Sequence, residues 1–193
     1  MELLRLTIGL PSWCEEEERV GTVYPTALDR MRLVVELAAR NVEEGSGGPF
    51  GAAIFGASSG RLLSVGVNSV VRLNNAMLHA ETVTLMRASA RLERFSLAPA
   101  DGGNGGELVE LYTSCEPCAM CLGAILWSGV RRVVFAARRD DAERLGFDEG
   151  PVFPETFAYL RRRGIRVESG PLRDDARKLM ERYRAVGGAI YNG

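Results

Sequence analysis

Histidine and lysine are almost missing from this chain of 193 residues. His79 is the single histidine, and Lys178 is the single lysine among 24 basic residues. One imidazole is therefore available to bind a metal. Net charge is also nearly missing, because 24 basic residues face 25 acidic ones. This balance leaves no general basic surface, so a nucleic-acid partner is not expected.

The sequence also has no long hydrophobic run. The segment 1–6 lacks the apolar core and the small-residue cleavage site of a signal peptide, and no later stretch approaches the length of a membrane span. We therefore expect a cytoplasmic protein without a membrane partner. Three of the four cysteines, Cys115, Cys118 and Cys121, are packed together. In the cytoplasm such a cluster points to metal or redox chemistry and not to disulfides.

Length and composition predict a single domain over residues 1–193. The chain is 46% hydrophobic, contains no internal repeat, and is shorter than two domains usually require. We divide it into an N-terminal extension over 1–24, a central body, and a C-terminal helix and tail over 170–193. Glycine-rich breaks at 45–48 and 101–106 separate elements within this domain.

Apolar periodicity predicts alternating helices and strands. Short apolar runs at 51–57 and 61–68, joined by a glycine turn, indicate a β-hairpin. The order predicts a three-layer α/β/α sandwich with a mixed central sheet. The expected helices are 26–44, 79–94, 118–127, 140–144, 154–163 and 174–185, and the expected strands are 51–57, 61–68, 108–113, 131–136 and 165–168.

Two short motifs, His79-Ala80-Glu81 and Pro117-Cys118-Ala119-Met120-Cys121, supply three metal ligands at the starts of two predicted helices. Cys118 and Cys121 are three residues apart and so share one helix face. Structural zinc sites usually use four protein ligands, whereas catalytic ones use three and leave a position for water. Glu81 is then placed to take the proton of that water. Alone, the cysteines fit a redox pair or a structural half-site equally well, and a single histidine is often only a buried residue.

Together these motifs resemble the signature of the zinc-dependent nucleobase deaminases, the cytidine deaminase-like superfamily. More narrowly, the chain is similar to bacterial guanine deaminases through further segments. These are 48–54, Asn68, 113–125 and 146–149.

The resemblance implies a cytidine deaminase-like fold, one Zn²⁺ per chain held by His79, Cys118 and Cys121, and a homodimer. It also implies hydrolysis of guanine to xanthine and ammonia, as in purine catabolism, with Glu81 moving the proton from zinc-bound water. Glu149 is expected to take a second proton-transfer role. The residues expected to bind the base are Asn68, Phe50, Ala80, Trp127 and Tyr191.

Simpler interpretations of these residues stay open. Asn68 also fits a turn residue that caps the hairpin, and Phe50 and Trp127 fit the core. Glu149 fits a solvated loop carboxylate, and Tyr191 fits a ring packed on the surface without acting as a lid.

Other functions also stay open. Residues 75–78 and the extension over 1–24 differ from the shorter guanine deaminases, which leaves amino-triazines such as ammeline as alternative substrates. A tRNA adenosine deaminase would need a surface for a polyanion. A zinc-stabilised interaction module would need a fourth ligand, and Cys115 is the only candidate nearby.

Overall fold

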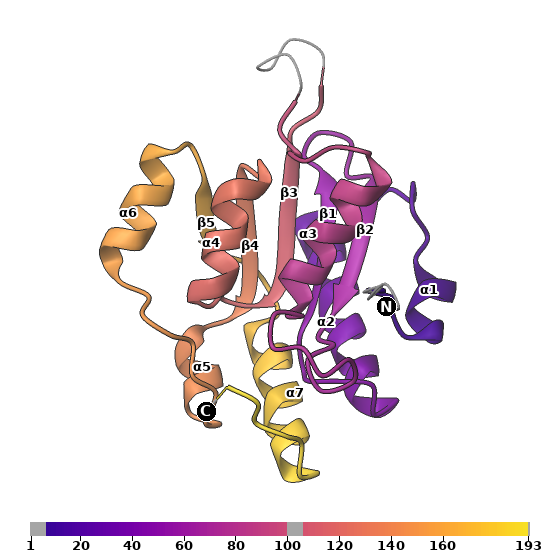
Figure 1. The fold of residues 1–193 in the computed structure, drawn as a ribbon, viewed down its shortest axis with the longest axis vertical. Coiled ribbons are helices and arrows are strands. Elements are labelled where there is room, and N and C mark those ends of the chain that lie inside the picture. The colour runs from indigo at the N-terminus through magenta and orange to yellow at the C-terminus, as the bar shows by residue number, and fades with distance from the viewer. Residues whose placement is uncertain (1–6, 100–105, 193) are drawn as a thin grey trace, which may run out of the picture.

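The computed structural model describes residues 7–99 and 106–192 and contains a five-stranded mixed sheet (Figure 1). The sheet order is β2-β1-β3-β4-β5. β1 pairs antiparallel with both β2 and β3, whereas β3, β4 and β5 run parallel. The strands are β1 (Gly51–Gly56), β2 (Leu62–Val67), β3 (Val109–Cys115), β4 (Arg132–Ala137) and β5 (Arg166–Ser169).

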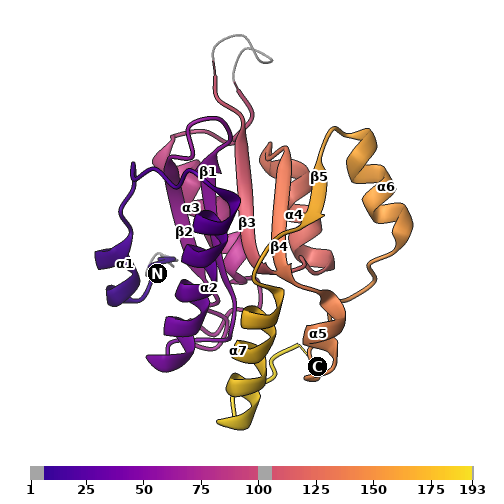
Figure 2. The same ribbon diagram turned by 180° about the vertical axis from the view of Figure 1, so that it is seen from behind.

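Helices cover both faces of this sheet. α3 and α4 lie on the face toward the viewer in Figure 1, whereas α2 and α7 lie on the opposite face, seen from the front in Figure 2. The helices are α1 (Ser12–Glu17), α2 (Ala27–Glu43), α3 (Ala80–Arg91), α4 (Ala119–Ser128), α5 (Arg139–Glu143), α6 (Pro154–Arg162) and α7 (Arg173–Ala185). The expected three-layer α/β/α sandwich is therefore confirmed.

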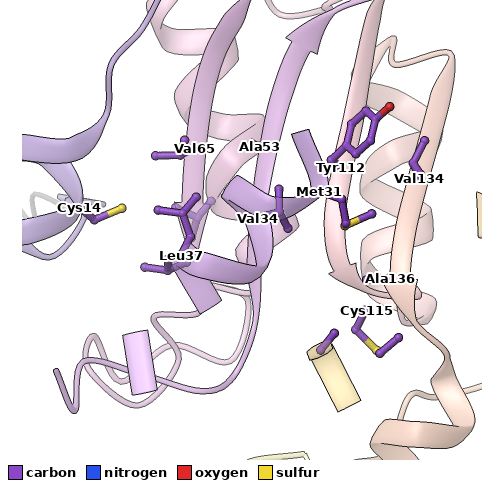
Figure 3. Packing of buried hydrophobic residues seen from close by; sticks show 14 of the residues in the cluster. Cys14, Met31, Val34, Leu37, Ala53, Val65, Tyr112, Cys115, Val134 and Ala136 are labelled. Atoms are coloured by element: carbon purple, nitrogen blue, oxygen red, sulfur yellow. The ribbon is translucent and has the colours of Figure 1, made fainter. Parts of the chain in front are cut away.

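Alternate residues of the central strands enter two separate cores, as the two-residue period of a strand requires. On β1, Ala53 and Phe55 belong to the core beneath α2 and α7, whereas Ala52 and Ile54 belong to the core beneath α3 and α4. Figure 3 shows residues of the first core around Met31. Because both sheet faces are buried, β1 reads as a continuous apolar run instead of an alternating one.

The expected helices and strands are all present, with ends that differ by up to three residues from the predicted ranges. The sequence analysis did not predict α1, which is short and rich in glutamate. Its buried residues Trp13 and Cys14 pack into the core beneath α2 and α7, which we call the α2 core. Trp13 Nε1 donates a hydrogen bond to Ser46 Oγ at 3.1 Å. Most of the 101–106 break and the first six residues of the extension lie outside the described residues. Within the described ranges no helix is long and apolar enough to cross a membrane.

Candidate active site

The two predicted ligand motifs meet where α3 and α4 begin. His79 is the N-cap residue of α3 and Cys118 is the N-cap residue of α4, with Cys121 in the first turn. His79 Nδ1 lies 3.5 Å from Cys118 Sγ and 3.7 Å from Cys121 Sγ. All three ligand atoms lie within 4.8 Å of one another. Tetrahedral zinc with ordinary bond lengths places nitrogen and sulfur ligands about 3.6 Å apart, so the spacing fits this ion.

The donor set also fits zinc chemically. The pKa of Cys118 is lowered to about 4, first by a hydrogen bond from Cys121 and then by His79, against the opposing effect of burial. Cys118 is therefore a thiolate at neutral pH, which is the form that binds metals. Among the described residues, His79, Cys118 and Cys121 form the only such cluster of three ligands.

Cys115 does not complete a four-ligand structural site. Its thiol contacts the backbone oxygen of Arg138, with Sγ and O separated by 3.7 Å, and burial raises the pKa of this thiol well above its usual range. Cys115 is also not part of the cluster in which the ligand atoms of His79, Cys118 and Cys121 lie within 4.8 Å of one another. The three-ligand arrangement is the one that catalytic zinc sites use.

Glu81 lies beside the ligand cluster and is held from the sheet. Thr113 of β3 donates a hydrogen bond to Glu81 Oε1 at 3.0 Å, while Glu81 Oε2 lies 3.5 Å from Cys121 Sγ. Only 6% of Glu81 is exposed. Burial, followed by the charge of Cys118, raises the pKa of Glu81. A carboxylate with raised proton affinity beside a metal can accept a proton from water and release it again.

A cavity opens beside this cluster. His79, Glu81 and Cys118 line it together with four of the other predicted residues, Phe50, Asn68, Glu149 and Tyr191. The rings of Phe50, Phe147 and Tyr191 form one aromatic group, with Phe147 centred 5.2 Å from Phe50 and 5.3 Å from Tyr191. The cavity therefore has a polar floor and an aromatic wall, as sites for flat heterocycles require.

Asn68 makes a turn contact, which was one of its two interpretations, and its side chain also lines the cavity. Its Oδ1 accepts from Val70 N at 3.3 Å, which is a turn contact, and its Nδ2 is buried with no hydrogen-bond partner among the described residues. Asn41 supports the segment around it, because Asn41 Nδ2 donates to the backbone oxygens of Gly48 and Asn68. A Cβ on Gly47 would lie 2.0 Å from Asn68 O, so the glycine break at 45–48 allows this close approach.

Glu149 is buried in the cavity wall and not solvated as a loop carboxylate. It is 7% exposed, and its backbone oxygen accepts from Ala119 N at 2.9 Å, at the start of α4. Burial first, and then the charges of Cys118 and Glu81, raises the pKa of Glu149 to about 8. Its carboxyl group is therefore protonated at neutral pH and can donate to a leaving group.

The C-terminal tail closes one side of the cavity. The ring of Tyr191 packs against Phe147 and lies 6.2 Å from the His79 ring. The next residue, Asn192, pairs with Asp148: Asp148 N donates to Asn192 O at 3.0 Å, and Asn192 Nδ2 donates to Asp148 O at 2.6 Å. Ala189 O accepts from the Tyr183 hydroxyl at 2.8 Å. The tail is thus tied to the body at both ends.

Two residues expected to bind the base do not line this cavity. Trp127 is in the last turn of α4 and is 78% exposed, in a groove that it shares with Met77, Met86 and Phe95. The turn of the helix from Cys121 to Trp127 carries the side chain away from the ligand face. Ala80 is fully buried at the start of α3, and its carbonyl accepts from Thr84 Oγ1 at 2.7 Å.

Several residues of the site were not predicted. Phe147, Glu116 and Asn192 line the cavity, and Thr113 and Asn41 hold its polar groups. Phe147 and Thr113 lie inside segments that carry the family resemblance, which was the available signal. Asn41 lies in the last turn of α2 and Asn192 near the chain end, where nothing local distinguishes a site residue.

Comparisons with known proteins agree with this geometry. Residues 26–137, more than half of the chain, match the cytidine and deoxycytidylate deaminase zinc-binding region. The guanine deaminase of Bacillus subtilis is 38% identical over 125 residues, which are 65% of this chain and 73% of that protein.

Solved structures extend the match to nearly the whole chain. The guanine deaminase from Nitrosomonas europaea is 42% identical with a TM-score of 0.87, covering 94% of this chain and 97% of that one. A structure of NE0047 in complex with 2,6-diaminopurine is 43% identical with a TM-score of 0.88, covering 96% of both chains. The chain therefore belongs to the zinc-dependent deaminases of the cytidine and deoxycytidylate deaminase family and is a homologue of guanine deaminase.

Proposed function

We propose that this protein hydrolyses guanine to xanthine and ammonia. The observation that carries the proposal is the cavity that joins the His79, Cys118 and Cys121 cluster and Glu81 to an aromatic wall. A metal-ligand triad next to a buried carboxylate supplies hydrolytic chemistry, and the wall suits a flat base. The guanine deaminases among the similar proteins support guanine as that base.

His79, Cys118 and Cys121 would hold one zinc ion per chain. When bound, zinc supplies a Lewis acid that lowers the pKa of water. Glu81 accepts a proton through Oε2 and delivers it to the ring nitrogen beside the carbon that carries the amino group. Glu149, protonated at neutral pH, then donates a proton to the departing amine. Water supplies the oxygen that replaces the amino group. Its second proton leaves the new hydroxyl group as the carbonyl forms and restores protonated Glu149, so the products are xanthine and ammonia.

The remaining cavity residues bind and enclose the base. Phe50 packs against its face, and Asn68 Nδ2 donates a hydrogen bond to its edge. Tyr191 covers the base as a lid and keeps other water away from the reacting carbon. A tRNA substrate is not favoured, because the C-terminal tail covers one side of the cavity and the net charge of the chain is -1. A purely structural zinc module is not favoured either, because the site has three ligands instead of four.

An ammonia-release assay on the zinc-loaded protein tests the reaction. The panel is guanine, adenine, cytosine, guanosine, ammeline and tRNA. We expect guanine to give the highest kcat/KM and tRNA to give no ammonia. Greater turnover of ammeline or tRNA than of guanine would overturn the proposed substrate.

We also propose that the chain is a single deaminase domain that acts in the cytoplasm as a homodimer. The exposed side chains Met77, Met86, Phe95 and Trp127, which share a groove beside α3 and α4, support the dimer because large apolar patches usually mark interfaces. Light scattering should give twice the 21.0 kDa chain mass, and Trp127→Glu should give the monomer. A monomeric wild-type protein would reject the dimer.

A further inference from the structure

The cavity contains buried polar atoms that the described protein leaves without hydrogen-bond partners. Three of them belong to residues that line it: Asn68 Nδ2, the Tyr191 hydroxyl and Asn192 Oδ1. Leaving a buried polar atom unpaired costs free energy, so native proteins rarely keep several in one place without a ligand or water to satisfy them. Two of the three are contributed by consecutive residues of the C-terminal tail.

Hydrogen bonds within the protein determine which atom each amide presents to the cavity. The Asn192 amide faces the Asp148 carbonyl oxygen at 2.6 Å, and a carbonyl only accepts, so the facing atom is Nδ2. The Asn192 atom left over is therefore the acceptor Oδ1. In the same way, Asn68 Oδ1 is used by Val70 N, which leaves the donor Nδ2. The two amides thus offer the cavity one donor and one acceptor.

A ligand that satisfies both amides must carry an acceptor and an N–H donor of its own. A free purine base has ring nitrogens of both kinds, whereas alkylation of a ring nitrogen removes an N–H. The backbone pairing of Asn192 with Asp148 holds the acceptor directly beside the segment that carries Glu149. The tail therefore presents a recognition group close to the proton donor.

We propose that Asn192 is a substrate-binding residue, and that its Oδ1 accepts a hydrogen bond from a ring N–H of the free base. This assignment rests on the proposed function for the identity of the base. In this arrangement the tail both covers the base through Tyr191 and reads one of its edges through Asn192. A site built around such an acceptor discriminates strongly against an analogue that lacks the N–H.

The test measures equilibrium binding by the zinc-loaded Glu81→Gln protein, in which turnover is removed. Guanine and its 1-methyl, 7-methyl and 9-methyl derivatives are titrated with and without Asn192→Ala. We expect Asn192→Ala to weaken guanine binding by about 10- to 100-fold. In the parent protein, we expect at least one of the methyl groups to weaken binding of the base by more than about ten-fold. In Asn192→Ala the same methyl group should weaken binding by less than about three-fold.

Tyr183→Phe is the matched control, because it removes the hydroxyl that ties Ala189 without touching the cavity amides. It should bind guanine within about three-fold of the parent. Three results would each overturn the assignment. Tyr183→Phe could weaken guanine binding as much as Asn192→Ala does, or Asn192→Ala could bind guanine as tightly as the parent. The parent and Asn192→Ala could also discriminate equally against the methylated bases. Guanine turnover by the wild-type protein is measured in parallel. No turnover, together with the expected binding differences, would reject the reaction and leave the role of Asn192 standing.

Discussion

The three ligand side chains lie close enough that removing one should empty the metal site. His79→Ala takes away the only imidazole and leaves two thiols, which is too few ligands for a stable zinc site. We expect zinc content to fall from about one ion per chain to less than about 0.2, measured by elemental analysis of purified protein. Cys115→Ser is the control and should keep its zinc. Full zinc occupancy in His79→Ala would contradict the ligand assignment.

Glu81 is expected to act in chemistry and not in metal binding. Glu81→Gln preserves the side-chain shape and the hydrogen bond from Thr113 but cannot accept the proton. Zinc content and melting temperature should stay near wild type, while kcat for guanine falls by about 10²- to 10⁴-fold. Steady-state kinetics with zinc analysis of the same sample measures both. Turnover within a few-fold of wild type would mean that another group moves the proton.

At the scale of elements, one buried carboxylate ties the N-terminal extension to α3. Glu18 accepts hydrogen bonds from Arg87 at 2.7 Å, from Arg91 at 2.8 Å and from Val65 N at 3.1 Å. Burial opposes ionisation of Glu18, but the bonds from Arg91, Val65 N and Arg87 outweigh it and lower its pKa. The extension therefore adds an ion-pair network to the edge of the sheet instead of a catalytic group.

Glu18→Gln should reduce the free energy of unfolding by about 2 kcal/mol at pH 7, because two guanidinium groups lose their partner. Since the pKa of Glu18 is lower in the folded state, its contribution is complete above the unfolded value of about 4.5 and disappears as the pH falls through the folded value. The difference between wild type and Glu18→Gln in urea unfolding should therefore shrink below pH 4.5. Exposed Glu16→Gln is the control. A difference that does not change with pH would exclude this ion pair as the cause.

The elements themselves were largely predictable from local patterns. The hairpin of β1 and β2 follows from two apolar runs around a glycine turn, and α2 follows from its helical spacing. α1 was not predictable in this way, because six residues with three glutamates carry no apolar period. It is stabilised by tertiary contacts instead, including the Arg40 guanidinium, which lies 4.9 Å from the centre of the Trp13 ring.

At the scale of the whole molecule, the tail should control access to the site. Deletion of residues 188–193 removes Tyr191 and Asn192 from the cavity but leaves the metal ligands in place. We expect kcat/KM for guanine to fall by at least about ten-fold, with zinc content unchanged and a melting temperature lowered by only a few degrees. Tyr191→Phe keeps the covering ring and should stay within about three-fold of wild type.

Unchanged kinetics in the deletion would refute the lid. A collapse of stability with loss of zinc would instead mean that the tail mainly holds the fold together. The small stability effect is expected because the tail packs at the edge of the α2 core, whereas the body of that core is formed by α2, α7 and the sheet.

Local spacing in the sequence was enough to predict the cluster of His79, Cys118 and Cys121 that the structure contains. Cys118 and Cys121 are three residues apart, so helix geometry places them on one face before any folding contact is made. His79 and Glu81 are only two residues apart at the start of α3, so the chain itself keeps them close together. The starts of the two helices could also be predicted, because the apolar periodicity that defines a helix is local. Local spacing was sufficient because the motif residues within each pair are close along the chain.

Which residues line the cavity depends on tertiary packing. Trp127, expected in the site, is on an exposed groove, whereas Asn192 lines the cavity 44 residues from its partner Asp148. Such contacts join distant segments, and whether a side chain points inward depends on the packing angle of the whole helix or tail. No local pattern encodes that angle, because it is set by the combined packing of sheet, helices and tail.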